Sequence, residues 1–344
     1  MDARARGLLA HRTSAATDWS LADLLAKKGD TTVSVILPAL NEEATVGSIV
    51  RTIRRELADI AHPLVDELVV LDSGSTDKTS AVAAAAGATV IHRDDVLPHV
   101  PVVDGKGEAM WRGLVETTGD LVVFVDADLR SFTSSYVIGL LGPLLADRNI
   151  QLVKAVYERP FVEGTEITPA GGGRVTELVA RPLINLHWPE LAGVIQPLAG
   201  EYAARRSLLE CLPFPCGYGV EFALLVDTLN AVGMEAIAQV DLGVRVHRHH
   251  DEQRLGRMAA EIIQTAMSRL GQDGSIQCNG ELGPAIAQFD RTPDGYVVTS
   301  HDVSGLERPP LVTLAEYRVI DLSVKGDSLP AQMPGSTSRP TQAP

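Results

Sequence analysis

The chain has 344 residues, enough for one large domain or a domain and a half with a sizeable core. Its formal net charge of −14 argues against a nucleic-acid groove, which normally shows as a basic patch, but a few placed cations would still accommodate small anionic substrates. No apolar run approaches the ~18 residues that span a bilayer, and the N-terminus lacks the apolar core of a signal peptide. We therefore expect a cytoplasmic protein without membrane insertion.

Three cysteines, Cys211, Cys216 and Cys278, form no Cys-x-x-Cys pair. Cys211 and Cys216 could bridge in principle, but an odd count without a secretory context favours reduced thiols. We expect all three to be structural.

Strand and helix signals alternate through the first half, after one short amphipathic helix candidate at 19–27. The predicted strands are 33–37, 67–71, 89–91 and 121–125, and the predicted helices are 46–57, 80–86 and 108–116. Pro38 should end the first strand and Asn41 should cap the helix that follows. This alternation predicts an α/β protein with a mostly parallel, doubly wound sheet and helices on both faces.

The pattern loosens after residue 150. We expect strands at 151–157, 236–240 and 243–250, and helices at about 175–186, 221–231 and 252–270. The final residues, 328–344, are rich in Pro, Ser, Thr and Gln, a composition typical of disorder.

Two carboxylates, Asp126 and Asp128, follow the buried strand at 121–125. Residues two apart on an extended backbone point to the same side, so both can reach one hard cation, which prefers oxygen ligands and commonly keeps substrate phosphates. Ligands of open α/β sheets gather at the carboxyl ends of the strands. The pair therefore predicts a divalent metal site.

Two common nucleotide fingerprints are absent. No Gly-x-Gly-x-x-Gly follows the first strand, which weakens a dinucleotide interpretation. The run at 74–79 lacks the second glycine of a phosphate loop before its lysine.

Four other motifs occur in order, each after or beside a predicted strand. They are Pro-Ala-Leu-Asn-Glu-Glu at 38–43, Asp-Ser-Gly-Ser-Thr-Asp at 72–77, Gly-Lys-Gly at 105–107 and Asp-Ala-Asp at 126–128. This set resembles the nucleotide-sugar half of GT-A glycosyltransferases, where Asp-x-Asp binds a divalent metal on the diphosphate. The resemblance implies that Lys106 meets the diphosphate and that Asp72 contacts the base or ribose. It implies that the nucleoside is held by Pro38, Ala39, Leu40, Glu42 and Ser73.

A glycine-rich run at 171–173 precedes Arg174 and Thr176, at the expected start of a helix. Backbone N–H groups and the helix dipole favour an anion there, and Arg174 can bind a phosphate or carboxylate bidentately.

With the motifs at 198–202, 217–221 and 246–249, the set resembles the retaining glucosyl-3-phosphoglycerate synthases of family GT81, over roughly residues 15 to 325. The resemblance implies transfer of glucose from UDP-glucose to the 2-hydroxyl of 3-phosphoglycerate, a product that in mycobacteria begins the methylglucose lipopolysaccharides. It suggests a homodimer, with the 252–270 helix and the C-terminal segment as candidate contacts. It divides the chain into an N-terminal extension (1–30), a nucleotide-sugar-binding half (31–150), an acceptor-binding half (151–327) and a disordered tail (328–344).

The same resemblance assigns roles to individual residues. Asp128 and His247 would be direct metal ligands, with Asp126 beside them on ribose, metal or metal-bound water. One imidazole among oxygens suits Mn²⁺ better than Mg²⁺, although Mg²⁺ is more abundant. Glu221, aided by Tyr218, would orient the sugar. The acceptor would be held by Gly173, Arg174 and Thr176.

For the reaction itself we expect front-face internal return, in which the departing diphosphate helps to deprotonate the acceptor hydroxyl. The metal and Lys106 would stabilise the leaving group, and the backbone carbonyl of Leu198 would stabilise the oxocarbenium face. Double displacement would instead need a carboxylate close to the anomeric carbon, for which Glu221 or Glu201 would serve.

Three alternatives stay open. GDP-mannose could replace UDP-glucose as donor, because only base and hydroxyl contacts separate the two. A metal-dependent sugar nucleotidyltransferase would release pyrophosphate, but its glycine-rich basic loop is missing after the first strand. A sugar-nucleotide sensor would bind the donor without transferring it.

Overall fold

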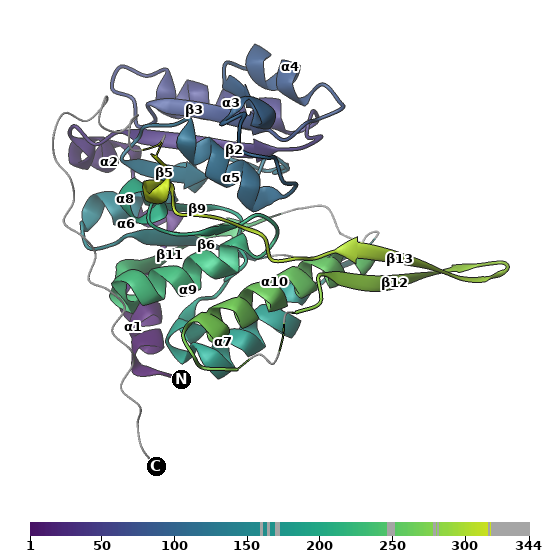
Figure 1. The fold of residues 1–344 in the computed structure, drawn as a ribbon. Coiled ribbons are helices and arrows are strands. Elements are labelled where there is room, and N and C mark those ends of the chain that lie inside the picture. The colour runs from purple at the N-terminus through teal and green to yellow at the C-terminus, as the bar shows by residue number, and fades with distance from the viewer. Residues whose placement is uncertain are drawn as a thin grey trace.

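The computed structural model describes residues 1–158, 161–163, 166–168, 173–245, 252–277, 280, 282–315 and 317. An eight-stranded sheet runs through the middle of the molecule, helices cover it, and a two-stranded arm projects to one side (Figure 1).

The large sheet has the strand order β1, β11, β6, β9, β5, β2, β3, β4. Its strands are β1 Thr13–Ala15, β2 Val33–Ala39, β3 Glu67–Asp72, β4 Thr89–His92, β5 Leu121–Phe124, β6 Leu152–Glu158, β9 Tyr202–Arg205 and β11 Ile237–Val244. Every neighbouring pair is parallel except those of β9, which runs antiparallel to β5 and β6. The expected mostly parallel sheet is confirmed; the reversed β9 was not predicted.

Three antiparallel pairs lie outside this sheet. They are β7 Phe161–Glu163 with β8 Glu166–Thr168, β10 Phe214–Pro215 with β14 Glu307–Arg308, and β12 Ala285–Thr292 with β13 Gly295–Asp302.

The helices are α1 Ala3–His11, α2 Leu21–Lys28, α3 Val46–Ile53, α4 Thr79–Ala85, α5 Lys106–Val115, α6 Ser135–Ala146, α7 Arg181–His187, α8 Arg206–Leu209, α9 Val220–Val232 and α10 Glu252–Gln272. Wider π-helical turns follow α3 at Arg54–Ala58 and precede α7 at Thr176–Ala180. Within the described ranges, none of these helices has the length and apolar character needed to cross a bilayer.

Alternate strand residues face two separate cores. Val35 and Val123 pack on the side of α2, α3 and α6, whereas Ile36 and Phe124 pack on the side of α5 and α9. Successive strand residues point to opposite faces, and helices cover both. This is why the strands are continuous apolar runs in the sequence.

Two local predictions at the end of the first strand are wrong. β2 continues through Pro38, which pairs with Leu71 of β3. The Ile36 carbonyl points to β5, where it accepts from Val125 N–H. The backbone nitrogen of Pro38, two residues later, points to the same side, but β5 has ended there, so the missing N–H costs no ladder hydrogen bond. Asn41 does not cap a helix: it has a φ of 58°, and the N-cap of α3 is Thr45.

The second half differs more from expectation. The strands predicted at 236–240 and 243–250 form one strand, β11, as far as residue 244; residues 246–250 lie outside the described part. α6 and the β12–β13 arm were not predicted. The N-terminal extension contributes β1 to the sheet beside β11. Cys211 and Cys216 are free thiols, whereas Cys278 and the predicted tail lie outside the described residues.

Candidate active site

A cavity of about 1400 Å³ opens where β2, β3 and β5 end. Its wall includes the predicted donor, catalytic and acceptor residues Pro38, Ala39, Leu40, Glu42, Ser73, Lys106, Asp126, Asp128, Gly173, Arg174, Thr176, Leu198, Tyr218 and Glu221. The fold thus brings together residues from both halves of the sequence. His247, the predicted third metal ligand, lies outside the described residues.

Lys106 forms two ion pairs in the cavity wall. Its Nζ lies 2.5 Å from Asp126 Oδ1 and 2.8 Å from Glu221 Oε1. Burial alone would lower the pKa of Lys106, but these two carboxylates raise it well above its usual value. Burial also opposes ionisation of Asp126, yet Lys106 and Arg245 hold its pKa well below the ordinary range. Lys106 is therefore a fixed positive charge.

Arg245 joins the two carboxylates of the acidic pair. Its Nη2 donates to Asp126 Oδ2 at 3.0 Å and to Asp128 Oδ1 at 3.1 Å. The two carboxylates therefore converge on one cationic atom, as the sequence predicts for a metal. Oxygen ligands of this kind fit Mg²⁺ or Mn²⁺. Among the described residues, no group of three or more His, Cys, Asp or Glu side chains is placed to hold a metal, so a third protein ligand would come from elsewhere.

The loops that follow β2 and β3 are tied to one another by side chains. Asn41 N–H donates to Ser75 Oγ at 3.0 Å, and Asn41 Oδ1 accepts from Thr76 N–H at 2.8 Å. Glu42 N–H donates to Thr79 Oγ1 at 2.7 Å. These bonds join the loop after β2 to the loop after β3.

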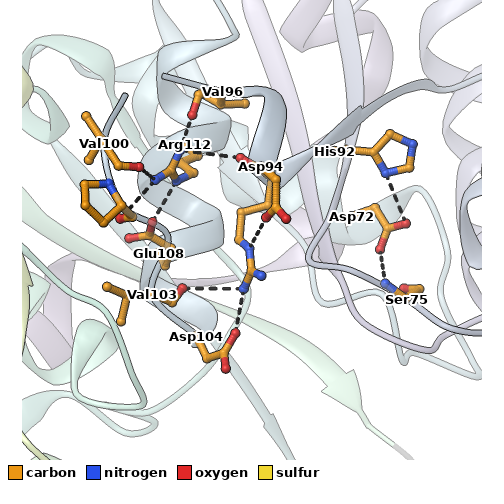
Figure 2. A network of polar contacts seen from close by, with 12 residues as sticks. Asp72, Ser75, His92, Asp94, Val96, Val100, Val103, Asp104, Glu108 and Arg112 are labelled. Carbon is orange, nitrogen blue, oxygen red and sulfur yellow. Dashed lines mark hydrogen bonds and ion pairs between the residues drawn. The ribbon is translucent and has the colours of Figure 1, made fainter. Parts of the chain in front are cut away.

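Asp72, a buried residue at the end of β3, stabilises the loop that follows this strand. It is only 2% exposed and is absent from the cavity wall. Its Oδ1 accepts from Ser75 N–H at 2.8 Å, and His92 Nδ1 lies 3.6 Å from its Oδ2 (Figure 2). Asp72 therefore fixes the turn that follows Ser73, and its contact with the base or ribose stays a prediction.

A second loop, 93–104, is held by a buried arginine of α5. Arg112 donates to the carbonyls of Val96 and Val100 and to Glu108 Oε1, the last at 2.7 Å (Figure 2). Glu108 also pairs with Arg308 of β14. The loop brings Arg93 into the cavity wall, where it pairs with Asp104 at 2.9 Å.

Close backbone approach explains three glycines at the site. A Cβ on Gly105 would lie 2.2 Å from the Cys216 carbonyl oxygen, and one on Gly107 would lie 1.8 Å from that of Pro215. A Cβ on Gly200 would lie 2.2 Å from Asp126 Oδ2. Only glycine at 105 and 107 lets the start of α5 lie this close to the backbone of residues 215–216. Only glycine at 200 leaves room for the Asp126 carboxylate.

The opposite wall is less tightly connected. Arg174 Nη1 lies 3.4 Å from Glu252 Oε1, and both side chains are largely exposed. Tyr218 N–H donates to Glu261 Oε2 at 2.6 Å, and its hydroxyl accepts from Arg254 at 2.8 Å. These groups offer cationic donors to an anionic ligand.

Sequence analysis missed four basic residues near the site: Arg93, Lys154, Arg245 and Arg254. Lys154 is buried, and its Nζ donates to the Ala199 carbonyl at 2.6 Å. Arg245 precedes His247 by two residues, and in the strand predicted at 243–250 that spacing would have put both on one face. The others gave no local signal.

Comparison with known proteins agrees with this geometry. The family described as Glycosyl transferase family 2 matches residues 34–170. The chain is 51% identical to the glucosyl-3-phosphoglycerate synthase of Mycolicibacterium smegmatis over 297 residues, which cover 86% of this chain and 94% of that protein.

Solved structures of glucosyl-3-phosphoglycerate synthase are also similar to this chain. The glucosyl-3-phosphoglycerate synthase of Mycobacterium tuberculosis in complex with Mn²⁺, UDP-glucose and phosphoglyceric acid is 48% identical, with a TM-score of 0.75 and coverage of 86% of this chain and 95% of that one. The same enzyme in complex with Mg²⁺ and UDP is 47% identical, with a TM-score of 0.77 and coverage of 88% and 98%.

Proposed function

The chain belongs to the glucosyl-3-phosphoglycerate synthases, a family of glycosyltransferases, and we propose on this premise that it transfers glucose from UDP-glucose to the 2-hydroxyl of 3-phosphoglycerate, with retention and release of UDP. The cofactor is Mg²⁺ or Mn²⁺, as in the related complexes.

One observation carries the proposal: charged side chains suited to two anionic ligands line the same cavity. Lys106 and the acidic pair form one wall, and Arg174 and Thr176 lie in another. Its volume of about 1400 Å³ exceeds the roughly 300–1,000 Å³ of ordinary small-ligand pockets, which leaves room for two substrates. A sensor that binds only the donor would not need the second anion site.

The donor would lie along the loops after β2 and β3, with its diphosphate at Lys106. A divalent cation held by Asp126 and Asp128, with His247 as the third ligand, would act as a Lewis acid on the departing diphosphate. Lys106 adds a fixed charge where negative charge develops, and its ion pairs keep it oriented before reaction.

We keep front-face transfer as the route to retention. Of the two carboxylates considered as nucleophiles, Glu221 is ion-paired with Lys106, and Glu201 is fully buried and ion-paired with Arg245 at 2.9 Å. Both therefore stabilise cations that hold the site together. Glu221 and Tyr218 would orient the sugar, the Leu198 carbonyl would face the anomeric carbon, and Gly173, Arg174 and Thr176 would hold the acceptor's phosphate and carboxylate.

A donor and acceptor panel tests the proposal. UDP-glucose and GDP-mannose are each incubated with 3-phosphoglycerate, 2-phosphoglycerate or glycerate, with Mg²⁺, Mn²⁺ or EDTA, while UDP or GDP release is followed. We expect release only with UDP-glucose, 3-phosphoglycerate and metal together. Faster release from GDP-mannose, or formation of pyrophosphate, would overturn the assignment.

We further propose a homodimer in which the β12–β13 arm packs on a second copy of the chain. The arm projects from the body (Figure 1), and Phe289, Tyr296, Val297 and Val298 on it are more than half exposed. An isolated two-stranded hairpin is marginally stable in water, so a second copy would give it a partner. Light scattering on Phe289→Asp/Val298→Asp should show a monomer; an unchanged mass would contradict this.

The two free thiols, Cys211 and Cys216, agree with the cytoplasm as the compartment of this reaction.

A further inference from the structure

One guanidinium group stands between the two carboxylates expected to bind the metal. Arg245 follows directly on β11 and is 5% exposed. Through a single nitrogen, Nη2, it bonds to Asp126 at 3.0 Å and to Asp128 at 3.1 Å. A buried cation therefore sits between the same two carboxylates that a divalent metal would use.

The other edge of this guanidinium is anchored to the scaffold. Nη1 donates to Glu201 Oε2 at 2.9 Å and to the Tyr157 hydroxyl at 2.8 Å, and the group lies 5.2 Å from the centre of the Tyr157 ring. Both partners are buried, Tyr157 on β6 and Glu201 just before β9. One edge is thus held by rigid strands, while the other reaches a carboxylate pair that is partly exposed to the cavity.

The six ion-paired side chains around Arg245 and Lys106 carry an excess of negative charge. Two cations, Lys106 and Arg245, are paired with four carboxylates, those of Asp126, Asp128, Glu201 and Glu221. The net charge of these six side chains is −2, so one divalent cation would neutralise them. If that cation took the two aspartates, the Nη2 edge of Arg245 would lose both of its acceptors while Nη1 kept Glu201. A buried donor without an acceptor is costly, so Nη2 would need a new anionic partner.

We infer that Arg245 holds the place of the divalent cation between Asp126 and Asp128, so that the guanidinium and the metal compete for these carboxylates. The inference rests on the proposed function, because the donor's diphosphate is the anion that would receive the released Nη2 edge. Arg245 is then a positioning residue that makes metal and nucleotide bind cooperatively. It weakens the binding of metal alone and strengthens the binding of metal with diphosphate.

Mn²⁺ titrations followed by electron paramagnetic resonance, with and without UDP, test this inference. Arg245→Met should bind Mn²⁺ alone about tenfold more tightly than the wild type, equivalent to the loss of ~1.4 kcal/mol of competing interaction. UDP should then strengthen Mn²⁺ binding by a smaller factor than in the wild type. Arg205→Met, in the β9 arginine that bonds to carbonyls at the opposite end of the sheet, should leave both quantities unchanged.

A second variant covers the case in which Arg245→Met does not fold because the buried Glu201 loses its ion pair with Arg245. Glu201→Gln/Arg245→Met removes that charge and should show the same gain in affinity for Mn²⁺ alone. Unchanged or weaker binding of Mn²⁺ alone in a folded variant overturns the role of Arg245. The proposed function fails separately, if the wild type with UDP binds no Mn²⁺ and releases no UDP from UDP-glucose and 3-phosphoglycerate.

Discussion

The cavity wall that we assign to the donor, with Lys106 and the acidic pair, and the wall that we assign to the acceptor, with Arg174 and Thr176, are built differently. On the donor wall, short loops that follow neighbouring strands bond to one another: Asn41 to Ser75 and Thr76, and Thr45 Oγ1 to the Ala127 carbonyl at 2.7 Å. On the acceptor wall, Arg174 lies 3.4 Å from an exposed glutamate, Glu252, and such exposed pairs contribute little to stability.

This difference indicates which wall is held in its binding geometry before a substrate binds. Parallel neighbouring strands bring their carboxyl ends to one edge, so the donor loops are positioned by the sheet. The acceptor wall combines Arg174 with Tyr218 and Arg254, which come from three separate elements. We expect a preformed donor site and an acceptor site that becomes ordered when its anion binds.

The largest expected effect on activity comes from removing a carboxylate of the acidic pair on the donor wall. Asp128→Ala should lower kcat/KM on the order of a thousandfold, because the metal supplies several kcal/mol of charge stabilisation in the transition state. Asp120→Ala, at the other end of β5, is the matched control and should stay within about threefold, since the Asp120 side chain bonds to Thr32, away from the cavity. Full activity of Asp128→Ala in steady-state assays would refute the metal site.

Arg112 tests whether donor-wall rigidity matters. Arg112→Met should lower the free energy of unfolding by about 2–4 kcal/mol, since a buried ion pair is broken while Glu108 keeps Arg308 as a partner. Its KM for UDP-glucose should rise more than its KM for 3-phosphoglycerate, because loop 93–104 borders the donor loops. Urea denaturation and paired KM measurements check both. Arg112→Lys should recover part of the stability, and an equal rise in both KM values would contradict the idea.

Lys154, which is buried behind the site and bonds to the Ala199 carbonyl, should give the protein a pH-dependent stability. Burial lowers the pKa of Lys154 to about 7 from 10.5. Above pH 7 the folded protein releases this proton while the unfolded chain keeps it, so stability rises with pH towards 10.5. The slope contributed is at most ~1.4 kcal/mol per pH unit. Urea denaturation from pH 6 to 9 should show this slope in the wild type and in the surface control Lys27→Met. In Lys154→Met the slope should be lost; parallel curves would disprove it.

Arg174 probes the acceptor wall by itself. Arg174→Gln should raise the KM for 3-phosphoglycerate roughly tenfold, the value of one charge-assisted hydrogen bond, and leave the KM for UDP-glucose nearly unchanged. Thermal stability should not move, because the Arg174–Glu252 pair is exposed. Arg181→Gln, in the next turn and paired with Glu177, is the control. A rise confined to UDP-glucose would place Arg174 on the donor instead.

The expected outline of the first half is confirmed because its signals are local. Buried parallel strands read as apolar runs such as 121–125, and polar residues directly after them must lie at one edge of the sheet. That logic placed Asp126 and Ser73 at one cavity, whereas Lys106 was predicted there from the family resemblance alone. It failed at Pro38 and Asn41, where strand pairing and loop contacts overrode single-residue preferences.

By itself, then, the sequence determined the parallel strands of the first half, the polar loops after them and the place of the acidic pair at the end of β5. Only the tertiary structure decided the partners of the buried cations. Arg245 meets Asp126 and Asp128 from 119 and 117 residues away, and Lys154 meets the Ala199 carbonyl from 45. Spacing along the chain specifies on which face of a strand or helix a side chain lies. A buried charge, however, is stabilised by the hydrogen-bonding groups that the fold places within about 3 Å of it. That depends on how distant elements pack.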